Sequence, residues 1–333
     1  MTKRLGKPPL TTVSESGKAR MRMNTVSKVL FTKGDKAALK TKIQSMSKKE
    51  LLVICDFDHT ISAFKVEPDG DLLCVSSHSV VEQAGLFGDE FQKESDKRFN
   101  TYYPLETDVH LSHEEREKVC NTWWSSSHDA IVQAGFHRSH ILEAVEATTH
   151  RMRLRPGAGD FFSKFHGSID RQLLVFSAGL ADIIEGILNS NGLKNVPVFG
   201  NRMHFDVDDN LVKFDEWIIH SCNKSESVER VVSSLRPDIW LKEHAGEGKP
   251  FNCMVVGDSL GDASMADNLE PVVENVLKVG FLNAHHNKRF PSYREAFDIL
   301  ITQDGSMTVL NMIIQAIEDE SRLDELLELF EFN

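Results

Sequence analysis

The sequence predicts an α/β fold in which helices cover both faces of a mainly parallel sheet and a helical domain is inserted. Three observations predict this fold class. Short apolar runs recur along the 333 residues, helical stretches separate most of them, and the interval 62–155 shows mainly helical patterns with charged and aromatic faces. Alternating strands and helices are typical of three-layer folds with a parallel sheet. The mainly helical interval therefore indicates an insertion.

The expected strands are short runs of aliphatic and β-branched residues. Strands that are buried on both faces of a parallel sheet give continuous apolar runs rather than alternating ones. On this basis the predicted strands are Leu51–Cys55, Leu173–Phe176, Met254–Val256, Leu277–Gly280 and Asp298–Ile301.

Helical patterns fill most of the remaining chain. The predicted helices are Lys36–Ser47, Ser112–Gln133, His140–Met152, Ala181–Leu188, Lys224–Leu235, Met307–Glu320 and Leu323–Phe330. The chain returns from the insertion through Arg155-Pro156-Gly157-Ala158-Gly159, which is predicted to act as a hinge. The domain plan is therefore a sheet domain of residues 36–61 and 156–333 with an inserted, mainly helical domain of residues 62–155.

The N-terminal region differs in charge from the rest of the chain. Residues 1–50 hold 13 Lys and Arg against 3 Asp and Glu, whereas the whole chain has a formal net charge of −12. We interpret residues 1–35 as a basic, disordered leader. A nucleic-acid-binding arm and an organelle-targeting sequence are the alternatives for this segment.

Two classes of protein are not expected. No apolar run approaches the roughly 20 residues of a membrane-spanning helix, and no secretion signal begins the chain, so a cytoplasmic location is predicted. The five cysteines are scattered without a Cys-x-x-Cys pair, so neither a disulfide framework nor a zinc module is predicted.

Two acidic residues follow the first predicted strand at once. Asp56 and Asp58 come directly after Leu51–Cys55, at the carboxyl end of a strand, where α/β sheets bind ligands. Extended residues two positions apart point to the same side, so both carboxylates can address one reacting group. Each acid alone could be a simple turn or cap residue.

A second acidic loop suggests that a cation lies between it and the Asp56–Asp58 loop. Asp258 and Asp262 lie in Gly257-Asp258-Ser259-Leu260-Gly261-Asp262, again directly after an apolar strand. Hard oxygen ligands at this density suit Mg²⁺. Two strand-terminal acidic loops about 200 residues apart favour a functional site over two unrelated turns.

Two weaker elements would suit a phosphate group. Ser177, in Val175-Phe176-Ser177-Ala178-Gly179, lies between a strand and a predicted helix, and helix N-termini attract phosphate. Lys224 begins another predicted helix and could offset phosphate charge. Taken alone, the first is an ordinary strand-to-helix turn and the second an exposed lysine.

The order of these elements resembles the four signature motifs of the haloacid-dehalogenase-like (HAD) phosphohydrolases. The motifs are Asp56-x-Asp58-x-Thr60, Ser177, Lys224 and Gly257-Asp258-x-x-Gly261-Asp262. The sequence in and around these motifs is similar to that of the cytosolic 5′-nucleotidase III (pyrimidine 5′-nucleotidase) family. The resemblance covers about residues 51–314 and implies a Rossmann-like core with a helical cap inserted over the site.

The resemblance also implies roles for individual residues. Asp56 would be the nucleophile and Asp58 the general acid and base. Thr60, Ser177, Ala178 and Lys224 would hold the phosphate, while Mg²⁺ would be bound by Asp56, the Asp58 carbonyl and Asp258, with Asp262 in support.

In the cap, the resemblance assigns base recognition to two residues. Tyr102-Tyr103-Pro104-Leu105-Glu106 points to Glu106, and Trp123-Trp124-Ser125-Ser126-Ser127-His128 points to Ser127. Trp123 and Trp124 offer stacking faces for a base, but they could equally fill the small core of the cap.

The resulting prediction is a monomeric, Mg²⁺-dependent 5′-nucleotidase that forms an aspartyl-phosphate on Asp56. The implied substrates are UMP and CMP, with 7-methyl-GMP as a further candidate, and neither a membrane nor nucleic acid is an expected partner. A HAD phosphatase acting on another phosphomonoester, such as phosphoserine, is the alternative. A lower-ranked alternative is a non-catalytic, nucleic-acid-associated protein that uses the basic leader.

Overall fold

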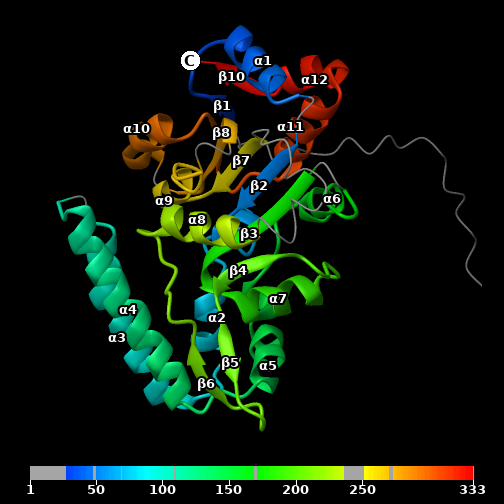
Figure 1. The fold of residues 1–333 in the computed structure, drawn as a ribbon. Coiled ribbons are helices and arrows are strands. Elements are labelled where there is room, and N and C mark those ends of the chain that lie inside the picture. Colours follow the sequence, from blue (N-terminus) through cyan, green and yellow to red (C-terminus); the bar gives the residue numbers. More distant parts are fainter. Residues whose placement is uncertain are drawn as a thin grey trace, which may run out of the picture.

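The computed structural model of the chain describes residues 28–47, 50–68, 70–108, 110–168, 171–235, 251–269, 273–284 and 286–332. Its main element is an eight-stranded sheet with the order β10-β1-β9-β8-β7-β2-β3-β4 (Figure 1). The six strands from β9 to β4 run parallel, whereas β1 and β10 run antiparallel to β9. These strands are β1 Val29–Phe31, β2 Leu51–Cys55, β3 Arg171–Leu180, β4 Val198–Asn201, β7 Phe251–Gly257, β8 Val273–Leu282, β9 Ile299–Thr302 and β10 Phe330–Phe332.

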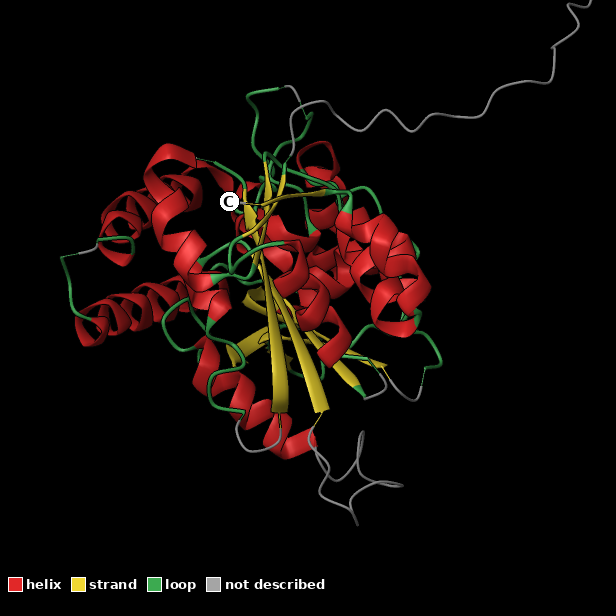
Figure 2. Cartoon of the chain, turned by 90° about the horizontal axis from the view of Figure 1, so that it is seen from above, coloured by secondary structure: helices red, strands yellow, loops and turns green. Residues whose placement is uncertain are grey.

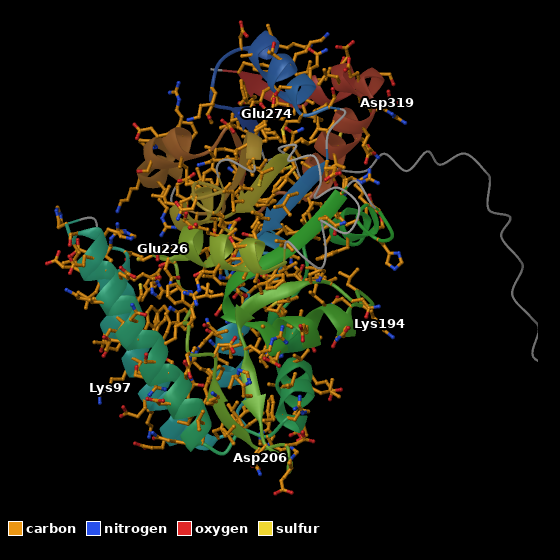
Figure 3. The ribbon with its side chains drawn as sticks, viewed as in Figure 1. Lys97, Lys194, Asp206, Glu226, Glu274 and Asp319 are labelled. Atoms are coloured by element: carbon orange, nitrogen blue, oxygen red, sulfur yellow. The ribbon has the colours of Figure 1, made fainter. Side chains whose placement is uncertain are left out.

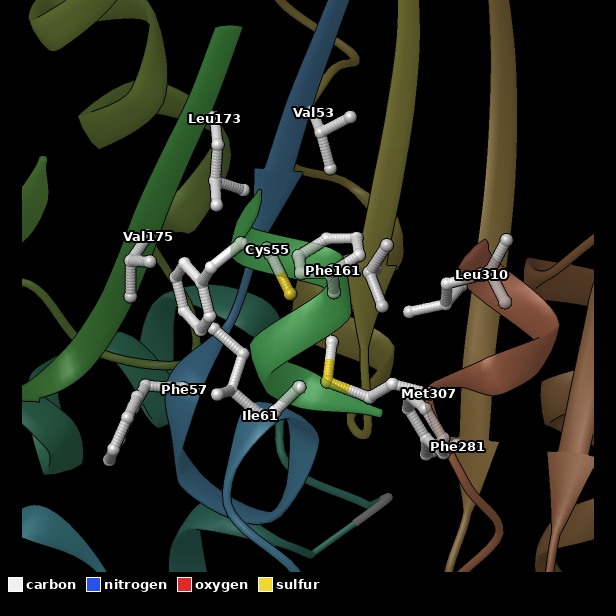
Figure 4. Packing of buried hydrophobic residues seen from close by; sticks show 14 of the residues in the cluster. Val53, Cys55, Phe57, Ile61, Phe161, Leu173, Val175, Phe281, Met307 and Leu310 are labelled. Atoms are coloured by element: carbon white, nitrogen blue, oxygen red, sulfur yellow. The ribbon is translucent and has the colours of Figure 1, made fainter. Parts of the chain in front are cut away.

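Helices cover both faces of this sheet (Figure 2), which is why the strand β2 is apolar at every position. Val53 and Cys55 pack into one cluster with α1, α6 and α11, as Figure 4 shows for part of it. Leu52 and Ile54 point to the other face, where they pack with α8. The helices of this core are α1 Lys36–Ser45, α6 Ala158–Ser163, α7 Ala181–Ser190, α8 Lys224–Leu235, α9 Leu260–Ala263, α10 His286–Ala296, α11 Thr308–Glu318 and α12 Leu323–Leu327.

The inserted helices lie beside the carboxyl half of the sheet. They are α2 Ser77–Gln83, α3 Gly88–Glu106, α4 His113–Gln133 and α5 Ser139–Thr148, with α3 and α4 forming a long pair (Figure 1). The hairpin of β5 Met203–Phe205 and β6 Leu211–Phe214 joins them, since the Phe214 ring stacks on His128 of α4 at 4.0 Å. Asp206, at the hairpin turn, is labelled in Figure 3. We call α2–α5 and this hairpin the cap.

The observed elements correct the domain plan at two places and a predicted helix at a third. Val29–Phe31 lies within the predicted leader but forms β1, between β9 and β10. Phe330, predicted to be helical, begins β10. The hairpin β5–β6 was expected in the sheet domain but packs on the cap. The first 27 residues of the leader lie outside the described residues.

Arg155, the first residue of the predicted hinge, is firmly held. Its guanidinium is buried and donates hydrogen bonds to the carbonyls of His59 and Thr60, to the Asp304 carboxylate and to Asn283. The same group stacks over the Phe281 ring. This segment is therefore anchored to the core rather than free to bend at Arg155.

Within the described ranges, no helix combines the length and the apolar character that crossing a membrane would require.

Candidate active site

Three neighbouring strands bring the predicted catalytic residues to one edge of the sheet. In the order β7-β2-β3, Asp258 follows β7, Asp56 follows β2 and Ser177 lies near the end of β3. The Asp56 backbone N–H donates to the Val256 carbonyl at 2.9 Å, so the ladder with β7 continues to the predicted nucleophile. Parallel strands place their carboxyl ends together, so residues far apart in sequence converge here.

Lys224 joins two of the acids. Its Nζ lies 2.7 Å from Asp56 Oδ1 and also donates to Asp262 Oδ1, and all three side chains are buried. Burial raises the pKa of Asp56 well above its usual range, although Lys224 opposes this shift. Burial alone would lower the pKa of Lys224, but Asp262 and Asp56 raise it above its usual value. Lys224 is therefore a fixed cation beside the proposed nucleophile.

The three acids Asp56, Asp258 and Asp262 form a candidate cation site. One carboxylate oxygen from each lies within 4.8 Å of the others. Asp262 Oδ2 already accepts from the Ser259 hydroxyl and backbone N–H, both at 2.8 Å, which suits a supporting role. Burial raises the pKa of Asp258 to about 6. Three acids opposed by one lysine leave negative charge that a hard divalent cation such as Mg²⁺ would neutralise, so the donor set fits this ion.

Asp58 is held by the cap. Ser77, the first residue of α2, donates its backbone N–H and its hydroxyl to the two Asp58 oxygens, both at 2.6 Å. Burial nevertheless raises the pKa of Asp58 above its usual value. A Cβ at Gly179 would overlap the Ser77 hydroxyl, so this glycine permits the close approach of α2 to the core.

The residues predicted to hold phosphate surround the same point. Thr60 is fully buried, and its hydroxyl has no hydrogen-bond partner among the described residues. Ser177 is also buried and accepts the Gly179 backbone N–H at 3.0 Å, while Asn201 donates to the Ala178 carbonyl at 2.7 Å. A buried hydroxyl without a partner is costly unless a ligand satisfies it, which supports a ligand at Thr60.

Glu106 reaches the core through the loop before α8. The Ser221 hydroxyl donates to Glu106 Oε1 at 2.5 Å, and burial raises the pKa of Glu106. A Cβ at Gly261 would overlap the Ser221 carbonyl oxygen, so the acidic loop and this loop are in direct contact. Next to Ser221, a hydrogen bond with Cys120 is the main cause that lowers the pKa of Cys222 to about 4.

The other predicted cap residues lie on α4. Trp123 and Trp124 stack with ring centroids 5.8 Å apart, and Tyr102 stacks on Trp123. Ser127 is buried, and in the part of the chain that is described its hydroxyl bonds to neither Glu106 nor the core acids. Both tryptophans are half-buried, so base stacking and packing of the cap both stay predictions for them, while the Ser127 hydroxyl has no partner among the described residues.

Several site residues were not predicted. Ser77 and Ser221 position Asp58 and Glu106, and nothing in their local sequence marks them. Arg155 was predicted only as part of a hinge, yet it holds the backbone of the Asp56–Thr60 turn. Asn283 donates to Asp258 Oδ2 at 3.1 Å. Its place just after β8 was a usable signal, because polar residues at the carboxyl ends of parallel strands commonly line a site.

Comparisons with known proteins identify relatives of this chain. The model of the pyrimidine 5′-nucleotidase (UMPH-1) family matches residues 59–318. A 7-methylguanosine phosphate-specific 5′-nucleotidase A from Xenopus laevis is 31% identical over 279 residues, which cover 83% of this chain and 91% of that protein.

Two solved structures are similar as well. Cytosolic 5′-nucleotidase IIIB bound to cytidine aligns with a TM-score of 0.72 at 26% identity, covering 90% of this chain and 95% of the other. A HAD family hydrolase from Salmonella enterica aligns with a TM-score of 0.50 at 15% identity, over 82% of this chain and 72% of the other, and shows a likeness of fold.

Proposed function

The chain belongs to the pyrimidine 5′-nucleotidase (UMPH-1) family, and on that premise we propose that it hydrolyses nucleoside 5′-monophosphates through an aspartyl-phosphate on Asp56. It is a 5′-nucleotidase, a phosphoric monoester hydrolase of the HAD fold. The observation that best supports the covalent route is the position of Asp56, whose carboxylate is buried and contacts Lys224. A carboxylate held in this way can attack phosphorus without losing a water shell.

The first half-reaction forms the phospho-enzyme. An Asp56 oxygen attacks phosphorus in line, and the bond from phosphorus to the ribose 5′-oxygen breaks. Asp58 gives its proton to that oxygen, and the nucleoside leaves. The raised pKa of Asp58 suits this role, because it keeps the acid protonated at a higher pH than an exposed aspartate.

The second half-reaction releases phosphate. Asp58, now ionised, takes a proton from a water molecule whose oxygen attacks phosphorus. The bond from phosphorus to Asp56 breaks, which regenerates the free carboxylate. Ser77 holds Asp58 in place for both proton transfers through two hydrogen bonds of 2.6 Å.

The remaining core residues hold the phosphoryl group. The ammonium of Lys224 offsets its negative charge, while Ser177, the Ala178 N–H and the unpaired Thr60 hydroxyl donate to its oxygens. Asp56, the Asp58 carbonyl and Asp258 would bind Mg²⁺, with Asp262 acting in support. When bound, this ion supplies positive charge that lowers the barrier to phosphoryl transfer.

Base recognition is assigned to the cap. Glu106 would accept a hydrogen bond from N–H groups of the base, and Ser127 would contribute the hydroxyl that lacks a protein partner. The Glu106 carboxylate can accept a hydrogen bond from the N3–H of uracil or from the exocyclic amine of cytosine. The similar structure of cytosolic 5′-nucleotidase IIIB holds cytidine. We therefore propose UMP and CMP as substrates.

A second substrate class, 7-methyl-GMP, is favoured by a specific observation. Glu106 is half-buried and desolvation raises its pKa, so a cationic base beside it would stabilise its charged form, and Trp123 and Trp124 lie on the neighbouring helix α4. A similar Xenopus laevis protein is named for 7-methylguanosine phosphate. Cytoplasmic location, a monomeric state and the absence of a nucleic-acid partner stay predictions.

A substrate panel tests the proposal. The full chain is assayed on CMP, UMP, GMP, 7-methyl-GMP, phosphoserine and p-nitrophenyl phosphate, each with and without Mg²⁺. We expect Mg²⁺-dependent turnover with the highest kcat/KM on CMP, UMP or 7-methyl-GMP. Higher kcat/KM on phosphoserine would contradict the nucleotide assignment but leave the core mechanism standing.

A further inference from the structure

Three side chains outside the phosphatase machinery converge where the cap meets the core. Cys120 lies on α4 of the cap, whereas His220 and Cys222 lie in the loop before α8. One donor atom from each lies within 4.8 Å of the other two, and the sulfurs of Cys120 and Cys222 are 3.7 Å apart. About one hundred residues separate Cys120 from the other two, so no sequence motif indicates this cluster.

We propose that Cys120, His220 and Cys222 bind a soft divalent cation of the Zn²⁺ class and thereby tie the cap to the core. At a Zn–S length of about 2.3 Å, a tetrahedral site places two thiolate sulfurs about 3.8 Å apart. The observed separation of 3.7 Å matches that edge without any movement of α4 relative to the loop.

The histidine provides a second, independent observation. His220 is fully buried, and its Nε2 has no hydrogen-bond partner within the described ranges. Its Nδ1 accepts the backbone N–H of Cys222 at 3.2 Å. A buried imidazole with an unpaired nitrogen is unfavourable unless a ligand compensates. The ring lies beside both thiols. Because Nδ1 accepts from Cys222, the neutral ring carries its proton on Nε2, so a cation would bind the Nδ1 lone pair in place of that hydrogen bond or bind Nε2 after its proton is lost.

The ligand type separates this site from the acid cluster. Two sulfurs and one nitrogen favour Zn²⁺ over Mg²⁺, while the carboxylates of Asp56, Asp258 and Asp262 favour the harder ion. Three protein ligands leave a fourth position for water. Cys222 is only half-buried, so an ion can reach the cluster from solvent.

Occupancy would act on the cap. The loop with His220 and Cys222 carries Ser221, which holds Glu106, and leads directly into Lys224. An ion shared by this loop and α4 would fix the base-reading side of the cap against the catalytic core. Since product must leave past the cap, the bound ion is expected to lower turnover in saturating Mg²⁺, and a chelator selective for Zn²⁺ over Mg²⁺ is expected to restore it.

Cobalt provides a direct probe, because thiolate-to-Co²⁺ charge transfer absorbs in the near ultraviolet. The full-length Asp258→Asn protein, which lacks one proposed ligand of the acid site, is titrated with Co²⁺ in saturating Mg²⁺. The signal is the charge-transfer band, so it does not depend on turnover. We expect one thiolate-bound Co²⁺ per chain, displaced by Zn²⁺. Cys120→Ser and Cys222→Ser should each abolish the band, and His220→Gln should weaken binding by at least about tenfold. The matched control Cys74→Ser, another buried cysteine, should keep it.

A measurement on the unmodified protein covers the case in which a variant does not fold. Zn²⁺ should protect Cys222 from alkylation by iodoacetamide, as read by peptide mass spectrometry in the presence of Mg²⁺. The proposal is overturned if Co²⁺ gives no charge-transfer band, if the band survives in folded Cys120→Ser and Cys222→Ser, or if the two cysteines of the freshly reduced protein form a disulfide instead of binding the ion.

Discussion

The acids of the core and the residues proposed to bind the base in the cap differ in how their polar groups are satisfied. In the core, Lys224 pairs with Asp56 and Asp262, and Asn283 donates to Asp258. In the cap, the Ser127 hydroxyl and the Trp124 indole N–H are buried without partners among the described residues. The core acids are thus paired before substrate arrives, and the Thr60 hydroxyl is left for the phosphate, whereas the cap leaves the proposed base-binding hydroxyl unpaired.

This difference supports the proposed division of chemistry and base selectivity between core and cap. Groups that act on phosphorus must be in place during the reaction, so fixed ion pairs and hydrogen bonds serve them. Groups that choose a base gain most when the correct base pairs atoms that would otherwise stay unpaired. Damage to the core should therefore slow every substrate alike, while damage to the cap should change their ranking.

The strongest test of the core is Asp56→Asn. The amide cannot form the aspartyl-phosphate, so kcat should fall on the order of 10⁴-fold or more for nucleotides and p-nitrophenyl phosphate alike. Phosphate release and circular dichroism of the same purified sample measure activity and folding together. Turnover retained by the folded variant would rule out the covalent mechanism.

Removal of the divalent ion should give the next largest effect. Chelation is expected to lower kcat on the order of 10³-fold on every substrate, because charge on the phosphoryl group is no longer neutralised. The pKa of Asp258 is raised to about 6, so protons compete with Mg²⁺ below that pH. The apparent Kd for Mg²⁺, from activity titrations, should therefore increase as pH falls through 6. A pH-independent Kd would count against Asp258 as a ligand.

Ser77→Ala tests the one core acid that depends on the cap. Its hydrogen bonds lower the pKa of Asp58, so loss of the hydroxyl should raise that pKa further. If Asp58 must be protonated in the first step, the alkaline limb of kcat/KM should move to higher pH, with about tenfold lower kcat from poorer positioning. A lower kcat with an unmoved limb would indicate a purely structural role. Ser79→Ala, on the same helix, is the matched control.

Glu106→Gln should change the ranking of substrates. Loss of the negative charge should lower kcat/KM for cationic 7-methyl-GMP about tenfold more than for UMP, and leave p-nitrophenyl phosphate nearly unchanged. Because the pKa of Glu106 is raised, the unmodified enzyme should lose the same preference as pH falls through that pKa. Equal losses on all three substrates would move Glu106 from the base pocket to the catalytic machinery.

The smallest effect is expected for Ser127→Ala. The hydroxyl has no partner within the described part of the chain, so its removal should leave the melting temperature nearly unchanged. One lost hydrogen bond to the base should raise KM for a nucleotide by about three- to tenfold. A lower melting temperature with an unchanged KM would show that Ser127 serves the packing of α4 instead.

The sequence predicts the sheet core better than the cap. Leu51–Cys55 matches β2 at both ends, because a strand covered on both faces is apolar throughout. Asp56 and Asp258 follow such strands, so their convergence could be predicted. By contrast, β1 and β10 have three residues each, too few to show a pattern. They form because they pair with each other across about 300 positions of the chain.

The cap was predictable only in outline. Its long helix α4, His113–Gln133, begins one residue after the predicted start at Ser112, which caps it. The contact of Ser221 with Glu106 joins residues 115 positions apart, and the Ser77 contact with Asp58 depends on how α2 enters the core. Such pairs have no local signature. The residues around Glu106 could therefore be assigned only by resemblance, and their roles stay predictions.

The Ser77 contact with Asp58 bears on engineering. A chimera that exchanges the whole cap to obtain a new base preference would also remove the two donors that hold the core acid. A graft that keeps α2 and Gly179 together and replaces only α3 and α4 would leave that acid supported. The points at which such a chimera joins the two sequences should therefore keep Ser77 with the core, rather than follow the border between cap and sheet.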